Sequence, residues 1–208
     1  MQLVLASHNA KKLSELKGLL AGLDLAIVAQ GDLGIAEADE PHITFIENAL
    51  AKARHAAAAA GCAAIADDSG VCVDALAGAP GVVSAHFAGH VQPLPDREAT
   101  RRAQDAANNA LLLQRLKDTV ARSAHFVSSL VAVRHAEDPQ PLVAVGRWPG
   151  RILDVPRGDQ GFGYDPLMFI PDLDRTVAEM DAALKKAHSH RSRAMAQMRV
   201  LLHEVWGV

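Results

Sequence analysis

Cysteine and aromatic residues are scarce in this chain. Its two cysteines, Cys62 and Cys72, are too few for a disulfide framework or a four-cysteine zinc site. This scarcity favours a reducing compartment, and we expect the cytoplasm. Aromatic side chains make up only 4% of the residues, so the core is expected to be aliphatic. The 50% share of hydrophobic residues excludes a mainly disordered chain.

The chain also lacks an excess of positive charge and long apolar runs. Its formal net charge is −3, which argues against a nucleic-acid polymer or an anionic membrane as partner. A small anionic ligand remains compatible, because it needs only a local cluster of cations. No run of about 18 apolar residues is present, so no membrane span is expected. The first apolar run, residues 3–6, is too short for a signal peptide.

Short apolar runs alternate with helical patterns along the 208 residues. Thr44 and Glu47 form a capping-box pattern at the start of an alanine-rich helix, and Gly61 ends that helix. The alternation predicts one mixed α/β domain over residues 1–208, with room for two lobes. We expect strands over 3–6, 25–29, 63–66, 125–134, 142–148 and 167–170, and helices over 11–23, 44–60, 96–117, 177–184 and 189–205.

The first strand-to-helix connection is a candidate phosphate site. Helix N-termini in α/β folds favour anions. The connection has no glycine, so it is neither a Walker loop nor a dinucleotide-binding turn. A capped helix with solvated lysines explains the same pattern equally well. The residues concerned are Ser7, His8, Asn9, Ala10, Lys11 and Lys12.

Two further segments carry carboxylates. Asp67 and Asp68 are expected at the abrupt end of the strand over 63–66, followed by Ser69 and Gly70. Successive strand residues face opposite sides, so only one of the two aspartates can reach a given site. Mg²⁺ suits such a position, and we favour this over a solvated acidic turn. For Glu47 and Lys52, helix capping is the simpler explanation, and a metal-bound phosphate is the alternative.

Two later segments offer contacts for a planar or anionic group. Glycines around Phe162 and Tyr164 allow close approach to a base, although an ordinary glycine turn explains them too. Arg191 stands in a basic first helical turn, which opposes the helix dipole and so favours an anionic or carbonyl partner. The candidate residues are Phe162, Gly163, Tyr164, Asp165, Lys185, Ser189, His190 and Arg191.

Taken in order, these segments resemble the inosine triphosphate pyrophosphatase family, also called dITP/XTP pyrophosphatases. The resemblance runs from residue 3 to about residue 198, and the ordered set is far more specific than any one string. The matching strings are Ser7-x-Asn9-x-x-Lys12, Thr44-Phe45-Ile46-Glu47-Asn48-Ala49, Ile65-Ala66-Asp67-Asp68-Ser69-Gly70, Gly78-Ala79-Pro80-Gly81, Phe162-Gly163-Tyr164-Asp165-Pro166 and Ser189-His190-Arg191.

The resemblance implies a long mixed central β-sheet flanked by helices, with two lobes and an active-site cleft between them. It implies Mg²⁺-dependent hydrolysis of ITP, dITP and XTP to the monophosphate and pyrophosphate, by a homodimer. The chain departs from the family at three places, Gln160, His86-Phe87 and Lys185-Lys186.

The resemblance also implies roles for individual residues. Asp68 is the expected proton acceptor and a metal ligand, and Glu47 is a second carboxylate beside the metal. Residues Ser7 to Lys12, Lys52 and Lys185 are expected to bind phosphates. Ser69, Phe162 to Asp165, His190 and Arg191 are expected to line the nucleotide pocket.

These roles give a hypothesis for the reaction. Lys12 and Lys52 hold the β- and γ-phosphates while Asp68 accepts a proton from the water that attacks the α-phosphorus. Arg191 or a backbone N–H reads the carbonyl at position six of the purine. A nucleotide-binding module without catalysis is the rival, as is a phosphatase that releases orthophosphate.

Overall fold

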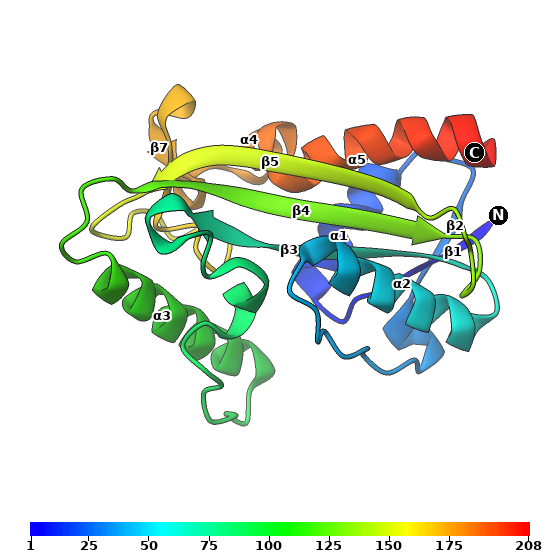
Figure 1. Cartoon of the computed structure of the whole chain (residues 1–208), viewed down its shortest axis with the longest axis horizontal. Helices are drawn as coiled ribbons and strands as arrows, with labels where there is room; N and C mark the ends of the chain where they lie inside the picture. The colour runs from blue at the N-terminus through cyan, green and yellow to red at the C-terminus, as the bar shows by residue number, and fades with distance from the viewer. The chain divides into compact units, whose positions relative to one another are not determined.

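The computed structural model describes the backbone of all 208 residues and every side chain except that of Ala10 (Figure 1). Seven strands form one sheet in the order β2-β1-β3-β4-β5-β6-β7. The strands are β1 (Gln2–Leu5), β2 (Ala26–Ala29), β3 (Ala63–Val73), β4 (Ser123–Val133), β5 (Leu142–Ile152), β6 (Met168–Ile170) and β7 (Arg175–Thr176). The sheet is mixed, because β1 pairs in parallel with β2 and β3 whereas β6 pairs antiparallel with β5 and β7.

Five α-helices flank this sheet. They are α1 (Ala10–Leu20), α2 (Phe45–Ala60), α3 (Arg97–Arg115), α4 (Ala182–His188) and α5 (His190–Leu201). The Thr44 hydroxyl accepts a hydrogen bond from the Glu47 N–H at 3.3 Å, which begins α2, and Gly61 ends α2 at a φ of 65°. Among the described residues, which leave out only the Ala10 side chain, no helix is long and apolar enough to cross a bilayer.

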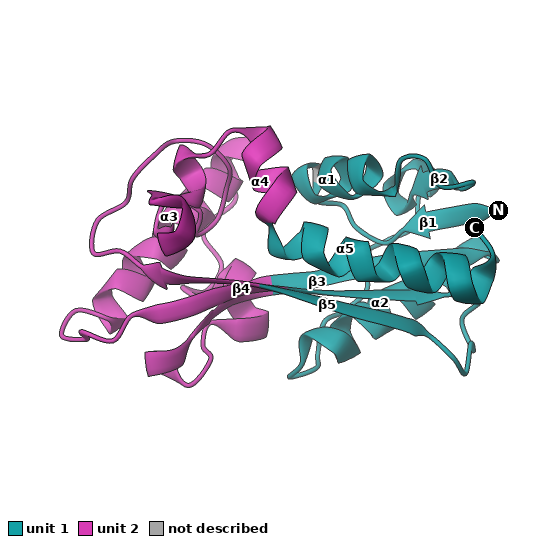
Figure 2. Cartoon of the chain, turned by 90° about the horizontal axis from the view of Figure 1, so that it is seen from above, with its two compact units in different colours: residues 1–69, 128–147, 189–208 teal, residues 70–127, 148–188 magenta. Residues whose placement is uncertain are grey.

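The chain divides into two compact units (Figure 2). Unit 1 comprises Met1–Ser69, Ser128–Arg147 and Ser189–Val208, and unit 2 comprises Gly70–Val127 and Trp148–His188. Strands β3, β4 and β5 contribute residues to both units.

Unit 1 has an apolar core on each face of its strands. One core joins odd-numbered residues of β3, such as Ile65, to leucines of α1 and methionines of α5. The other joins even-numbered residues of β3, such as Ala66, to the alanines of α2. This alternation follows from the two-residue period of a strand, and it determines which helix each later β3 side chain meets.

Unit 2 is built around its own aliphatic and aromatic core. Trp148 is almost fully buried there, together with Leu112 and Leu116 near the end of α3. At the other end of α3, the cap residue Asp96 accepts from the N–H groups of Glu98 and Ala99 at 3.1 Å each. The helix expected over 96–117 is therefore present with a conventional cap.

The expected mixed sheet with flanking helices is confirmed. The expected end of a strand at Asp67 is wrong, because β3 continues without interruption through Asp67-Asp68-Ser69-Gly70 to Val73. The helix expected over 177–184 is also wrong in extent. A short 3-10 turn at Val177–Glu179 precedes α4, which runs on to His188.

Candidate active site

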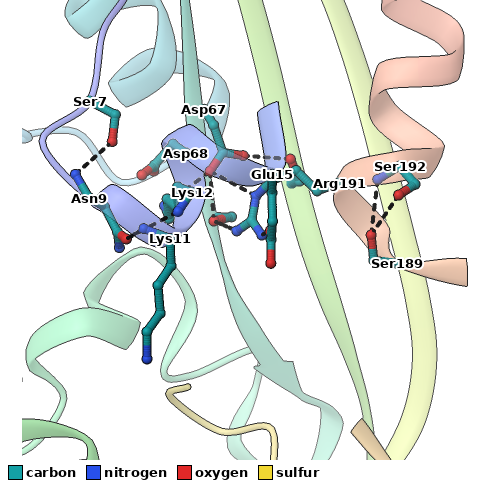
Figure 3. Close-up of polar contacts among 12 residues, drawn as sticks. Ser7, Asn9, Lys11, Lys12, Glu15, Asp67, Asp68, Ser189, Arg191 and Ser192 are labelled. Atoms are coloured by element: carbon teal, nitrogen blue, oxygen red, sulfur yellow. Dashed lines mark hydrogen bonds and ion pairs between the residues drawn. The ribbon is translucent and has the colours of Figure 1, made fainter. Parts of the chain in front are cut away.

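The loop from β1 into α1 folds around Asn9. The Asn9 side-chain oxygen accepts from the N–H groups of Lys11 and Lys12 at 3.1 and 3.2 Å, and the Ser7 hydroxyl accepts from the Asn9 N–H at 3.1 Å. Figure 3 shows Lys12 among the carboxylates of this unit, whereas the Lys11 side chain extends away from them. Ala10 was expected in the same loop, but its side chain lies outside the described part of the structure.

His8 contacts the segment that follows β2. Its Nδ1 lies 3.1 Å from the Gln30 amide nitrogen and 3.3 Å from a Glu37 carboxylate oxygen. Gln30 is itself buried. His8 therefore fixes the β1–α1 loop to the segment that follows β2.

Asp67 is fully buried and surrounded by hydrogen-bond donors. Its Oδ2 lies 3.0 Å from Lys12 Nζ and 3.4 Å from Arg191 Nε, and it accepts from the Ser69 hydroxyl at 3.0 Å. Its Oδ1 accepts from the Ser128 hydroxyl at 2.5 Å. Burial alone would raise the pKa of Asp67, but Lys12 and Arg191 outweigh it and hold this pKa far below its usual range. Asp67 is thus a permanent carboxylate with both oxygens occupied.

Asp68 points to the other face of β3, toward α2. Its Oδ1 accepts from Lys52 Nζ at 2.8 Å. Its Oδ2 is buried and has no hydrogen-bond partner among the described residues. Burial raises the pKa of Asp68, and the nearby Glu40 adds to this, against the opposing effect of Lys52. Two adjacent aspartates therefore have pKa values shifted in opposite directions, as is typical of paired carboxylates with different roles.

Lys52 joins Asp68 to Glu40, whose carboxylate lies 3.0 Å from the same ammonium nitrogen. Burial would lower the pKa of Lys52, but the charges of Asp68 and Glu40 outweigh that effect and raise it. The ammonium therefore stays charged while being only 11% exposed. Two of its three N–H donors go to Glu40 and Asp68, which leaves one for a phosphate oxygen.

The segment that carries Glu40 is fastened to α2. The buried side chain of Asn48 accepts from the His42 N–H at 2.9 Å and donates to the His42 carbonyl at 3.1 Å. Two turns further along α2, His55 Nε2 lies 3.0 Å from the Ala36 carbonyl. These contacts keep Glu40 beside Lys52.

Arg191 belongs to the first turn of α5, after the cap formed by Ser189. Its three guanidinium nitrogens contact three side chains: Nε the Asp67 carboxylate at 3.4 Å, one terminal nitrogen the Ser69 hydroxyl at 2.9 Å, and the other the Glu15 carboxylate (Figure 3). The side chain is only 2% exposed. Arg191 therefore forms an ion pair with Asp67 in this structure, and direct recognition of a base by Arg191 stays a prediction.

His190 is buried beside Arg191 at the start of α5. The approach of α5 to β5 is unusually close here, because a Cβ on Gly146 would collide with the His190 carbonyl. Only glycine fits at this position of β5. The first turn of α5 is thereby held against the sheet.

Several predicted residues of unit 2 contact one another. Asp165 Oδ2 accepts from the Phe162 N–H at 3.0 Å and from Lys185 Nζ at 2.8 Å. The same ammonium lies 4.6 Å from the centre of the Phe162 ring. Gly161 has a φ of 80°, and a Cβ there would collide with the Asp165 carboxylate. Lys185 is thus the lysine of the pair that faces this cluster, while Lys186 is exposed.

Tyr164 does not present its ring to a ligand. Its hydroxyl donates to the Ser84 carbonyl at 2.8 Å, and the side chain belongs to the core of unit 2. Burial, and to a lesser extent Asp105, raises the pKa of Tyr164 well above its usual value. Phe162 is consequently the aromatic side chain of this segment left to stack on a base.

The residues around Asp68 are compatible with a magnesium ion. Among the described side chains, no group of three or more His, Cys, Asp and Glu has the arrangement of a metal site. Mg²⁺, however, is commonly held by one or two carboxylates together with waters and substrate phosphates. The unpartnered Oδ2 of Asp68, with Glu40 on the same lysine, supplies that donor set.

The sequence of this chain matches the Ham1 family over residues 3–201. The chain belongs to the Ham1 family. A protein of Methylibium petroleiphilum named dITP/XTP pyrophosphatase is 67% identical over 206 residues, covering 99% of each chain. A second, from Leptothrix cholodnii, bears the same name and is 60% identical over 210 residues, again covering 99% of each.

Solved structures agree with this membership. A HAM1 protein from Coxiella burnetii is 39% identical, with a TM-score of 0.88 that covers 99% of this chain and 100% of the other. A Mycobacterium abscessus protein described as a nucleoside-triphosphatase / dITP/XTP pyrophosphatase is 40% identical, with a TM-score of 0.72 over 95% of this chain and 98% of its own. The expected family resemblance is confirmed.

Glu47 lies outside the cluster around Asp67 and Asp68 in this Ham1-family chain. It is exposed, and its carboxylate accepts from the Thr44 hydroxyl at 2.5 Å, as expected of a helix cap. The carboxylate that shares Lys52 with Asp68 is Glu40, which the motifs did not single out. A metal-side role for Glu47 therefore stays a prediction.

Glu15 and Ser128 were missed as well. Glu15 lies one helical turn beyond Lys12, and this spacing alone could have placed it near the same site. Ser128 lies within a strand without any sequence signal, and only the neighbouring position of β4 in the sheet brings it to Asp67.

Proposed function

We propose that this chain hydrolyses dITP, ITP and XTP to the nucleoside monophosphate and pyrophosphate, and so removes non-standard purines from the nucleotide pool. The observation that carries the proposal is the pair of adjacent aspartates with opposite environments. Asp67 is saturated with donors, whereas Asp68 keeps one unpartnered oxygen beside a charged lysine. The names of the Ham1 relatives support the substrate class.

In the proposed reaction, Asp68 is the general base. Its carboxylate accepts a proton from the water that attacks the α-phosphorus, and the bond from this phosphorus to the bridging oxygen of pyrophosphate breaks. Lys52 holds the Asp68 carboxylate through Oδ1 and offers its charge to the departing pyrophosphate.

Asp67 has an orienting role. It holds Lys12 at 3.0 Å, next to the capped start of α1, and so fixes an ammonium for the β- and γ-phosphates. Because its pKa is held far below its usual range, Asp67 keeps its charge throughout the reaction. Its neighbour Asp68 can therefore exchange a proton without disturbing the ion pairs of Lys12 and Arg191.

Mg²⁺ is the metal that we propose for this site. Four carboxylates, of Glu15, Glu40, Asp67 and Asp68, are paired there with three cations, of Lys12, Lys52 and Arg191. A triphosphate adds more negative charge than this balance can accept, so a divalent cation is required. Asp68 and Glu40 would hold the ion, which withdraws charge from the phosphoryl oxygens when bound.

Base selection follows from the substituent at position six. Inosine and xanthosine carry a carbonyl there and adenosine an amino group, so a donor in the site pairs with the former and is left unpaired by the latter. A buried unpaired donor costs about 1–3 kcal/mol. The proposal therefore includes a preference for ITP over ATP in kcat/KM.

The homodimer and the cytoplasmic location implied by the resemblance are part of the same proposal. The low cysteine content fits a reducing compartment. Light scattering of the purified chain tests the dimer, which a mass near 22.0 kDa in solution would refute.

The deciding experiment is a panel of nucleoside triphosphates assayed for pyrophosphate and orthophosphate, each with Mg²⁺ and with EDTA. We expect pyrophosphate from ITP, dITP and XTP with Mg²⁺, little from ATP, and none with EDTA. Orthophosphate as the product would indicate a phosphatase instead. Binding of ITP without any turnover would indicate the nucleotide-binding module.

A further inference from the structure

Helix α3 of unit 2 places two polar side chains against the glycine loop. Asp105 and Asn109 are four residues apart and therefore lie on one face of the helix. Asp105 Oδ2 accepts from the Gly163 N–H at 2.8 Å, and Asn109 Nδ2 donates to the Gly163 carbonyl at 2.9 Å. Both backbone polar groups of a single glycine are thus held by one helix.

These two contacts restrain a part of the backbone that is otherwise very free. Gly161 and Gly163, on either side of Phe162, have φ values of 80° and 62°. Glycine populates both signs of φ, so local sterics leave this loop many alternatives. The Phe162 N–H is fixed from one side by Asp165, and α3 fixes the next residue. The orientation of the Phe162 ring against Lys185 therefore depends on both restraints.

The contact of Asn109 is obtained at a cost. Its Oδ1 is buried, and no described residue forms a hydrogen bond with it. Turning the amide over would bring Oδ1 against the Gly163 carbonyl, so the observed orientation is the one that the loop imposes. A buried amide oxygen without a partner destabilises the fold. Such groups call for a functional reason, and holding the loop provides one.

We propose that Asp105 and Asn109 are positioning residues for base selection, although neither touches the substrate. They hold Gly163 so that Phe162 presents its ring, and Asp165 its carboxylate, in one geometry. The inference rests on the proposed function, because it assumes that this loop receives the purine base. When this loop is less restrained, the base binds more weakly and with less selectivity. The phosphoryl chemistry of Asp68 is unaffected.

The test compares Asn109→Ala and the milder Asp105→Asn with the wild type. Gln114→Ala serves as the control, since Gln114 is an exposed residue of the same helix. Hydrogen exchange of the free protein is followed over residues 158–167, and KM and kcat are measured with ITP and ATP. We expect faster exchange at this loop, a KM for ITP raised about five- to tenfold, a reduced preference for ITP over ATP, and a nearly unchanged kcat for Asn109→Ala. Asp105→Asn should give smaller changes of the same kind, because an amide oxygen can still accept from Gly163.

The outcomes separate this inference from the function on which it rests. Unchanged exchange in both variants overturns the restraint by α3, whatever the enzyme does. Faster exchange with an unchanged KM and an unchanged ITP preference overturns the role in base selection. An equal fall of kcat for both nucleotides, with KM unchanged, also overturns it. A wild type that releases no pyrophosphate from any nucleotide refutes the proposed function itself.

Discussion

Asp67 and Asp68 are chemically identical neighbours with different partners. Asp67 has four donors to its two oxygens, and Asp68 has one lysine and a buried oxygen without a partner. Removing a charge should therefore affect stability at Asp67 and catalysis at Asp68. At Asp67 it breaks buried ion pairs, and at Asp68 it removes a proton acceptor.

We expect Asp68→Asn to lower kcat by about 10²–10⁴-fold, because the amide cannot accept the proton of the attacking water. Its melting temperature should stay close to that of the wild type. Asp67→Asn is the matched comparison and should lower the free energy of unfolding by about 3–5 kcal/mol, since Lys12 loses its carboxylate and the buried Arg191 keeps only that of Glu15. Steady-state kinetics and urea unfolding of both variants measure the contrast. Nearly normal turnover by Asp68→Asn would remove Asp68 from the mechanism.

The sequence motifs identified many of the residues that meet in unit 1, including Lys12, Lys52, Asp68 and Arg191. Lys12 and Arg191 stand in the first turns of helices α1 and α5. Asp68 stands in the polar string that follows the apolar start of β3, and Lys52 lies one helical turn after Asn48. Glu15 could not be paired with Arg191 in this way, because 176 positions separate them. Glu40 lies in a loop whose course depends on contacts with α2. The sequence does not show which side chains will contact each other when many positions separate them.

At the scale of the element, β3 shows why the expected strand end was wrong. Aspartate and glycine are depleted in strands, so Asp67-Asp68-Ser69-Gly70 resembles a terminator. Contacts on both faces override that local preference. Asp67 and Ser69 continue the face that packs on α1 and α5, and Asp68 continues the face that packs on α2. The uninterrupted strand is what separates the two carboxylates.

The turn between β4 and β5 depends on another buried carboxylate, Asp138. Its two oxygens accept from the N–H groups of Arg134 and Gln140 at 2.8 and 2.9 Å. Burial would raise the pKa of Asp138, but these hydrogen bonds outweigh it and lower the pKa. The folded state therefore binds this proton less well than the unfolded state. The resulting stability is complete above the unfolded pKa of about 3.9 and is lost as pH falls through the folded pKa.

Asp138→Ala should accordingly destabilise the protein by about 1–3 kcal/mol at pH 7, because two backbone N–H groups lose a charged acceptor. The difference from the wild type should shrink as pH falls below about 4. Urea unfolding between pH 3 and pH 7 measures it, with the exposed neighbour Glu137→Ala as control. A destabilisation that is independent of pH would contradict the role of the carboxylate.

At the scale of the whole molecule, the balance of charge determines how an anionic ligand can bind. The chain is acidic overall, with a net charge of −3, and carboxylates outnumber cations even in the cluster around Asp67 and Asp68. The charges of this cluster alone therefore do not attract a polyphosphate. Binding of the anion and of a divalent cation should therefore be coupled, each raising the affinity for the other.

This coupling predicts how the product pyrophosphate affects the melting temperature. With Mg²⁺, pyrophosphate at 100 times its dissociation constant should stabilise the folded chain by about 2.7 kcal/mol. For a chain of this length that corresponds to a rise of roughly 5–10 °C. With EDTA the rise should disappear, and Glu40→Gln should need more Mg²⁺ than the wild type to restore it, because one of the two carboxylates offered to the ion is gone. An equal rise with EDTA would mean that Lys12 and Lys52 alone attract the anion, and the charge argument for a metal would fail.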